Sequence, residues 1–287
     1  MDQRLIELYD DYVHRHFDRR QFLSRAGVLL GSTAAASAAL TALQSNYAQA
    51  AVVEENDPRI VTERVTIQGG TGPVKAYLAK PKDGGKRGAI LVIHQNRGLN
   101  PHILDVTRRF AADGYVALGV DFLSPQGGTP DNDEAAMKLF PTTNADGAVA
   151  DARAAVAWLK ARPDVNGKVG AVGYCWGGGM VGRLAVAEPT LDAGVVYYGP
   201  TPAAADVAKI KAPLLLNYAD VKLDERIGAM LPGFEEALKK DGVKYTMYVY
   251  EGAQHAFNDD TAGPRYHAEA AKVALGRTMA FFKANLS

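Results

Sequence analysis

Two unbroken apolar runs constrain the fold of this chain more than any other feature: Ala89 to Ile93 and Pro213 to Leu216. Neither run alternates with polar side chains, so a strand formed by either must be buried on both faces. Strands of that kind belong to parallel sheets that are covered by helices on both sides. The two runs therefore predict a central, mostly parallel sheet.

Further short runs rich in β-branched and aromatic residues alternate with longer amphipathic segments, which is the pattern of an α/β domain. The expected strands are Thr62 to Gln68, Val74 to Ala79, Ala89 to His94, Val116 to Val120, Lys168 to Gly173, Ala193 to Tyr197, Pro213 to Tyr218 and Lys244 to Tyr250. The expected helices are His102 to Asp113, Asp146 to Lys160, Trp176 to Ala187, Pro232 to Asp241 and Pro264 to Asn285, with a short one at Asp133 to Phe140.

The glycine-rich segment Gly69 to Pro73 separates the first two expected strands, so we expect these two to pair as an antiparallel hairpin at one edge of the sheet. The other strands alternate with helices, as in a parallel sheet. The sequence thus predicts an α/β fold, arranged as a three-layer sandwich around a mostly parallel sheet of about eight strands.

The N-terminal part of the chain differs from the rest. Residues 26–53 carry no charged side chain, and they follow the basic stretch Asp18 to Arg25, which contains the pair Arg19 and Arg20. A basic stretch followed by an apolar segment is typical of a secretory signal. An arginine pair at this place is typical of the twin-arginine type of signal.

Small residues at Ala48 and Ala50 complete this pattern with a cleavage site. We therefore expect residues 1–50 to be a leader that the twin-arginine export machinery recognises through the arginine pair. Residues 51–287 would then form one domain, periplasmic or secreted after cleavage near Ala50. The alternative is a membrane anchor at residues 26–50, although that segment is only weakly hydrophobic.

Charge and cysteine content limit the classes of partner. The chain has 32 basic and 32 acidic side chains and no net charge, so it lacks the electrostatic footprint that nucleic acids or anionic membranes require. We expect a small-molecule partner instead. The single cysteine, Cys175, excludes an internal disulfide and a Cys-rich metal site. Any cysteine chemistry must therefore use one thiol, and we expect no cofactor.

Cys175 lies in the segment Gly173-Tyr-Cys-Trp-Gly177, between an expected strand and an expected helix. This is the Gly-x-nucleophile-x-Gly pattern of a nucleophile elbow, with Cys in place of Ser. Glycines beside the nucleophile relieve crowding at the sharp turn, and the helix N-terminus favours thiolate over thiol. The alternative is a small buried cysteine that fills a glycine-rich turn.

An acid and a base follow the nucleophile in that order in chains with such an elbow. His255 comes directly after the last expected strand, whereas His267 falls inside the final expected helix. His255 is therefore the expected base. The loop after the preceding strand offers three carboxylates, one of which would orient the imidazole unless all three are simply solvated: Asp220, Asp224 and Glu225.

Four segments together resemble the dienelactone hydrolase (carboxymethylenebutenolidase) family of α/β hydrolases. They are Gly173-Tyr-Cys-Trp-Gly-Gly178, His94-x-x-x-Gly98-Leu-Asn-Pro101-His, Asp113-Gly-Tyr-Val-Ala117 and Gly252-Ala-Gln-His-Ala-Phe257. The resemblance covers roughly residues 62–285. It implies the α/β-hydrolase fold and the hydrolysis of an ester or lactone without a metal or organic cofactor.

The resemblance also implies roles for individual residues. Cys175 corresponds to the nucleophile and His255 to the general base. Asp224 corresponds to the acid, because Leu223 to Ile227 resembles the acid-bearing turn of the family, and Asp220 is the alternative. The sequence thus predicts an acyl-enzyme mechanism with a Cys-His-Asp triad.

Two backbone N–H groups are expected to form the oxyanion hole: that of Trp176, directly after the nucleophile, and that of Asn96, after the strand ending at Ile93. Several aromatic side chains are expected at the rim of the substrate pocket, unless they are simply core residues: Phe122, Phe140, Trp176 and Tyr198.

The chain departs from the family pattern at its substrate-binding positions. The family has a Glu that contacts the resting thiol, and the matching residue here is Gln95, whose amide cannot accept a proton. Two arginines that hold a substrate carboxylate in the family correspond to Asp133 and to the pair Asn258-Asp259. Arg97 is a candidate replacement. An ester or lactone with little negative charge therefore fits as well as dienelactone itself.

Two rival functions remain at this stage. A lone thiol of low pKa also suits a non-hydrolytic protein that binds a ligand or senses oxidants through sulfenic acid chemistry. The presence of His255 and Asp224 in the order of a triad favours the hydrolase. The second rival, a dinucleotide-binding enzyme, is strongly disfavoured, because the glycines that follow Gly173 do not have the G-x-G-x-x-G spacing.

Overall fold

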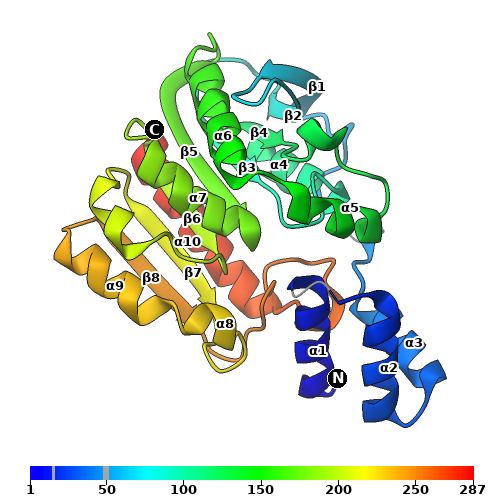
Figure 1. Cartoon of the computed structure of the whole chain (residues 1–287). Coiled ribbons are helices and arrows are strands. Elements are labelled where there is room, and N and C mark those ends of the chain that lie inside the picture. Colours follow the sequence, from blue (N-terminus) through cyan, green and yellow to red (C-terminus); the bar gives the residue numbers. More distant parts are fainter. Residues whose placement is uncertain (15–16, 48–51) are drawn as a thin grey trace.

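A twisted sheet between two layers of helices forms the body of the molecule (Figure 1). The computed structural model describes residues 1–14, 17–47 and 52–287. In these residues the sheet has eight strands in the order β1-β2-β4-β3-β5-β6-β7-β8. The strands are β1 (Ile60–Gln68), β2 (Pro73–Pro81), β3 (Arg87–Ile93), β4 (Val116–Val120), β5 (Val165–Tyr174), β6 (Ala193–Tyr197), β7 (Leu214–Ala219) and β8 (Tyr245–Tyr250).

Strand directions confirm the expected fold class. Strands β3 to β8 run parallel to one another, and β1 and β2 form the antiparallel hairpin at one edge. β2 also pairs antiparallel with β4. All of β4, β6 and β7, and nearly all of β3, are buried, as expected for unbroken apolar runs. The carboxyl ends of the parallel strands therefore meet at one edge of the sheet.

Helices cover both faces of the sheet and bury two separate cores. One face packs against α6 (Ala145–Lys160), α7 (Trp176–Ala187) and α9 (Leu231–Lys240). The other face packs against α4 (Pro101–Ala112) and α10 (Ala268–Leu286). The short helices α5 (Asp133–Leu139) and α8 (Glu225–Gly228) lie in connecting segments.

The prediction that His267 falls inside the final helix is wrong. α10 begins one residue later, and the His267 side chain caps it by accepting a hydrogen bond from the Ala270 amide at 3.2 Å. Capping satisfies one of the free N–H groups at a helix start. His267 therefore has a structural task at the boundary of the helix.

The N-terminal part of the chain folds into three helices: α1 (Gln3–His14), α2 (Arg19–Leu30) and α3 (Thr33–Leu43). They share a small apolar core that includes Tyr9, Phe22 and Leu40. Figure 1 shows this unit below the carboxyl ends of the strands, with α1 facing α8. The segment that the sequence marks as a leader is thus folded against the hydrolase-like domain.

The expected cleavage site at Ala48 and Ala50 lies outside the described residues. Within the described ranges, no single helix has both the length and the apolar character needed to cross a membrane. α2 and α3 would pass that test only as a pair, and they are bent by 115° relative to each other.

Candidate active site

A strained turn presents the Cys175 thiol at the carboxyl edge of the sheet. The residue lies between the end of β5 and the start of α7, with φ 55° and ψ −118°. Residues other than glycine rarely adopt a positive φ, and such backbone strain is concentrated at functional sites. A Cβ atom at Gly173 would lie 2.0 Å from the Gly177 oxygen, and one at Gly177 would lie 2.3 Å from the Ile93 oxygen. Both positions therefore require glycine.

An imidazole–carboxylate pair stands on the loops after the last two strands. His255 Nδ1 lies 2.7 Å from Asp224 Oδ2, and both side chains are buried. Asp220 is turned away and accepts hydrogen bonds from the Lys222 and Gly252 amides, each at 2.9 Å. The structure therefore brings Asp224 to His255, whereas Asp220 holds the loop.

A second imidazole, which the sequence analysis did not identify, touches the sulfur. His14, at the end of α1, places Nε2 3.2 Å from Cys175 Sγ. Its Nδ1 lies 2.8 Å from the Asp10 carbonyl oxygen and 3.2 Å from Asp10 Oδ1. The His14 and His255 rings meet edge to face, with centroids 4.9 Å apart. The thiol thus lies between two imidazoles, each of which has its own carboxylate.

One signal in the sequence could have revealed His14. Asp10 and His14 are four residues apart, which places them on one face of a helix. The amphipathic character of this segment marks a helix that packs against something. Assignment of the whole segment to a leader removed it from the search for site residues.

Both imidazoles act on the thiol. Burial alone would raise the pKa of Cys175, but His14 and His255 beside it bring that pKa well below its ordinary value. Burial would lower the pKa of His14, but the Cys175 sulfur and Asp10 raise it to about 9. The favoured state is therefore a thiolate with an imidazolium beside it.

Polar contacts hold α1 over the thiol. The Val13 carbonyl oxygen accepts a hydrogen bond from Asn96 Nδ2 at 2.8 Å, next to His14. Arg97 Nη2 donates to the Tyr9 hydroxyl at 3.1 Å. In this arrangement the Cys175 residue is only 6% exposed. α1 therefore lies against the sulfur and restricts access to it.

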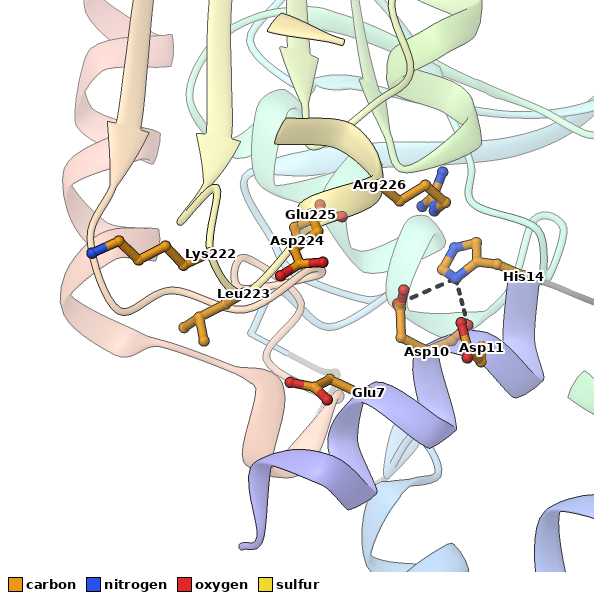
Figure 2. A pocket seen from close by; sticks show the side chains of 9 residues that line it. All are labelled: Glu7, Asp10, Asp11, His14, Lys222, Leu223, Asp224, Glu225 and Arg226. Carbon is orange, nitrogen blue, oxygen red and sulfur yellow. Dashed lines mark hydrogen bonds and ion pairs between the residues drawn. The ribbon is translucent and has the colours of Figure 1, made fainter. Parts of the chain in front are cut away.

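A cavity of about 240 Å³ lies between α1 and the loop that bears Asp224. Figure 2 shows side chains from both elements around it, with His14 next to Asp10. Cys175 is not among the lining residues, whereas His14, which lies against its sulfur, is one of them. Most of the lining side chains are charged: Glu7, Asp10, Asp11, Lys222, Asp224, Glu225 and Arg226.

The two expected oxyanion donors lie close to the elbow. Trp176 is the first residue of α7 and directly follows Cys175. A Cβ atom at Gly177 would lie 2.6 Å from the His94 oxygen, so the loop after β3, which contains Asn96, packs closely against the start of α7. Both backbone amides are thus on segments that meet beside Cys175.

Comparison with known proteins identifies the family. Residues 74–286 match the model of the dienelactone hydrolase family. The chain belongs to this family. Membership makes it a hydrolase of carboxylic esters or lactones, on the α/β-hydrolase fold. Residues 1–31 match a second model, described as YqhI-like, so the segment that forms α1 and α2 has relatives of its own.

Relatives and solved structures agree with this assignment. A putative carboxymethylenebutenolidase of Synechocystis sp. is 32% identical over 246 residues, which cover 79% of this chain and 98% of the relative. One of Methylorubrum extorquens is 32% identical over 279 residues, covering 91% of this chain and 93% of the relative. The crystal structure of a putative dienelactone hydrolase from Klebsiella pneumoniae superposes with a TM-score of 0.71 at 26% identity, covering 78% of this chain and 98% of that one.

Two candidate substrate-binding residues, Gln95 and Arg97, are engaged in contacts within the chain. Gln95 Nε2 donates to Asp259 Oδ2 at 3.0 Å. Arg97, the candidate replacement for the family's arginines, is buried, and its Nε lies 3.3 Å from Asp133 Oδ2. In this conformation neither side chain is free to hold a substrate carboxylate.

Two of the expected rim residues lie inside the wall of the site. Phe122 is 1% exposed and packs edge to face against Trp176, with ring centroids 5.6 Å apart. Tyr198 is fully buried, and its ring lies 5.1 Å from that of His255. Both therefore support the site from behind, whereas Phe140 and Trp176 are partly exposed. The rim expectation does not hold for Phe122 and Tyr198 in this structure.

The thiolate of Cys175 should form well below the ordinary thiol pKa of about 8.5. Ultraviolet absorbance of the thiolate, followed from high to low pH in the full chain, measures this, and the Cys175→Ala variant provides the background. In His14→Ala the midpoint should move upward, because one stabilising imidazole is lost. An unchanged midpoint in His14→Ala would show that the imidazole of His14 does not act on the sulfur.

Proposed function

We propose that this chain cleaves an ester or lactone by nucleophilic attack of Cys175, with His255 as base and Asp224 as its orienting acid. The observation that carries the proposal is the buried 2.7 Å contact between Asp224 and His255 beside a thiol on a strained elbow. A nucleophile, a base and a group that orients the base are the three parts of such a site. Family membership supports the same chemistry.

The proposed reaction begins with the Cys175 thiolate, whose proton has passed to His255. The sulfur attacks the carbonyl carbon, and the Trp176 and Asn96 amides donate to the oxyanion of the tetrahedral intermediate. When the intermediate collapses, the C–O bond breaks, and His255 gives its proton to the leaving oxygen. Water, deprotonated by His255, then cleaves the thioester, and the acid product leaves with the thiol restored.

The proposed substrate carries little negative charge. Arg97 is paired with Asp133 and is therefore not a free cation, and Gln95 is uncharged and bound to Asp259. The carboxylates of Asp224 and Glu225 lie at the neighbouring cavity. Both features disfavour an anionic substrate, because an unpaired carboxylate would have to leave water without a compensating partner.

Exchange of single carboxylates tests the triad. In the chain of residues 51–287, Asp224→Asn should lower kcat on a small aryl ester by up to about 10⁴-fold, because the amide no longer holds the reactive tautomer of His255. Asp220→Asn is the matched control and should leave kcat nearly unchanged. Cys175→Ala should abolish turnover. Equal losses in the two aspartate variants, or turnover by Cys175→Ala, would contradict the proposal.

We propose further that the active form lacks residues 1–50, since α1 covers the nucleophile in the full chain. An enzyme whose competent state is populated to 10% or less works at least about tenfold below its intrinsic rate. The chain of residues 51–287 should therefore exceed the full chain about tenfold or more in kcat/KM on small esters. Equal kcat/KM values, with both proteins folded by circular dichroism, would show that α1 does not obstruct the reaction.

Export is the proposed route by which the segment is lost. We propose that the twin-arginine machinery recognises Arg19 and Arg20, and that cleavage follows near Ala50. Arg19→Lys with Arg20→Lys keeps the charge but should retain the protein in the cytoplasm, whereas Arg4→Lys with Arg25→Lys should not. Mass spectrometry of the exported protein checks the cleavage, and a product that still contains residues 1–50 would contradict it.

A further inference from the structure

Three electron-pair donors converge in the covered site. A ring nitrogen of His14, the sulfur of Cys175 and a ring nitrogen of His255 all lie within 4.8 Å of one another. They come from three separate elements: α1, the elbow before α7 and the loop after β8. One imidazole and one thiol would suffice for the reaction, so the contribution of His14 is not explained by it.

On both histidines the contacts to oxygen atoms use Nδ1 and leave Nε2 for another partner. Asp224 binds Nδ1 of His255, and Asp10 binds Nδ1 of His14. Metal-binding histidines usually donate one N–H to a carboxylate or carbonyl oxygen in this way, which aims the other nitrogen at the ion. Nε2 of His255 is buried and has no hydrogen-bond partner among the described residues.

The number of protons does not match the number of acceptors. A neutral imidazole that donates from Nδ1 can only accept at Nε2. Two such nitrogens face one thiol, which has a single proton to share. A buried acceptor without a partner is costly, and a cation bound by all three atoms would satisfy both nitrogens and the sulfur together.

We propose that the full-length chain binds one zinc ion, or a divalent cation of similar softness, through His14 Nε2, Cys175 Sγ and His255 Nε2. Two imidazoles and one thiolate are a ligand set that suits Zn²⁺, with water in the fourth position. As the metal–ligand bonds form, the one proton that the sulfur and the two Nε2 atoms share is released to solvent. Zn–N bonds of about 2.0 Å and Zn–S bonds of about 2.3 Å place tetrahedral donors roughly 3.5 Å apart, close to the 3.2 Å between His14 Nε2 and Cys175 Sγ.

Such an ion fastens α1 to the catalytic domain. Two of its ligands belong to the elbow and the loop after β8, and the third belongs to α1, so release of α1 costs one metal bond. A coordinated thiolate is also withdrawn from attack on a carbonyl. The ion thus keeps the full chain inactive until residues 1–50 are removed. The metal site itself depends only on the three ligand atoms, whereas its inhibitory effect rests on the proposed reaction and on the proposed loss of residues 1–50.

Cobalt binding tests the ligand set directly. Metal-free full chain is titrated with Co²⁺, which reports a thiolate ligand by charge-transfer absorption and a four-coordinate site by intense visible bands. One equivalent should bind, and Zn²⁺ should displace it. Cys175→Ala should lose the charge-transfer absorption. His14→Gln should weaken binding more than Asp10→Asn, for which an outer-shell loss of about 10- to 100-fold is expected.

A matched control and a second readout complete the test. His267→Asn removes a histidine outside the site, keeps a capping side chain for α10 and should bind Co²⁺ as the unmodified chain does. Zn²⁺ should also slow hydrogen exchange in α1 of the full chain, but not in His14→Gln. Absence of stoichiometric binding, or undiminished binding by His14→Gln, would overturn the proposal. Ester hydrolysis by metal-free residues 51–287 is measured separately, so failure of one proposal is distinguishable from failure of the other.

Discussion

The turn at Cys175 is the constraint on which the rest of the site depends. Its positive φ is tolerated because glycines at positions 173 and 177 let the segment after β3 and the start of α7 come into contact. The turn places the sulfur at the edge where the parallel strands end. The loops after β7 and β8 begin at that same edge, and they bring Asp224 and His255 together. Sheet direction and one strained residue thus assemble groups that are far apart in the sequence.

Ionisation of the thiol is governed by imidazoles rather than by a neighbouring carboxylate. The position at which the family pattern has a Glu is Gln95, and its amide is bound to Asp259. The sulfur instead meets His14, whose charge is stabilised by Asp10. The attraction between a thiolate and an imidazolium is stronger in a buried site than in water, because the interior screens charges weakly. Without the Glu, the thiol still has two imidazoles that lower its pKa, and His255 is the one that does not belong to α1.

The fold and the contact between Asp224 and His255 could be predicted because each is marked by local patterns in the sequence. Unbroken apolar runs specify a parallel sheet, and the glycines around Cys175 mark a turn wherever the rest of the chain lies. α1 could not be placed in this way, since His14 and Cys175 are 161 positions apart and no local pattern encodes their contact. Phe122 and Tyr198 were expected at the rim of the pocket because an aromatic residue that follows a strand has the same sequence pattern at a pocket rim as in the core. Only packing separates the two.

Export, as proposed, and contact with the thiol would place two demands on the N-terminal segment, and the apolar core of that segment links them. Arg19 and Arg20 are exposed on α2, where an export receptor could reach them, while His14 is held against the thiol. The three helices share buried side chains such as Tyr9 and Phe22. Lifting α1 alone would expose this apolar surface, at a cost of about 1.5 to 3 kcal/mol for each large side chain uncovered. α1 is therefore not an independent flap. It leaves the thiol most easily when the whole three-helix unit leaves with it, as removal of residues 1–50 would accomplish.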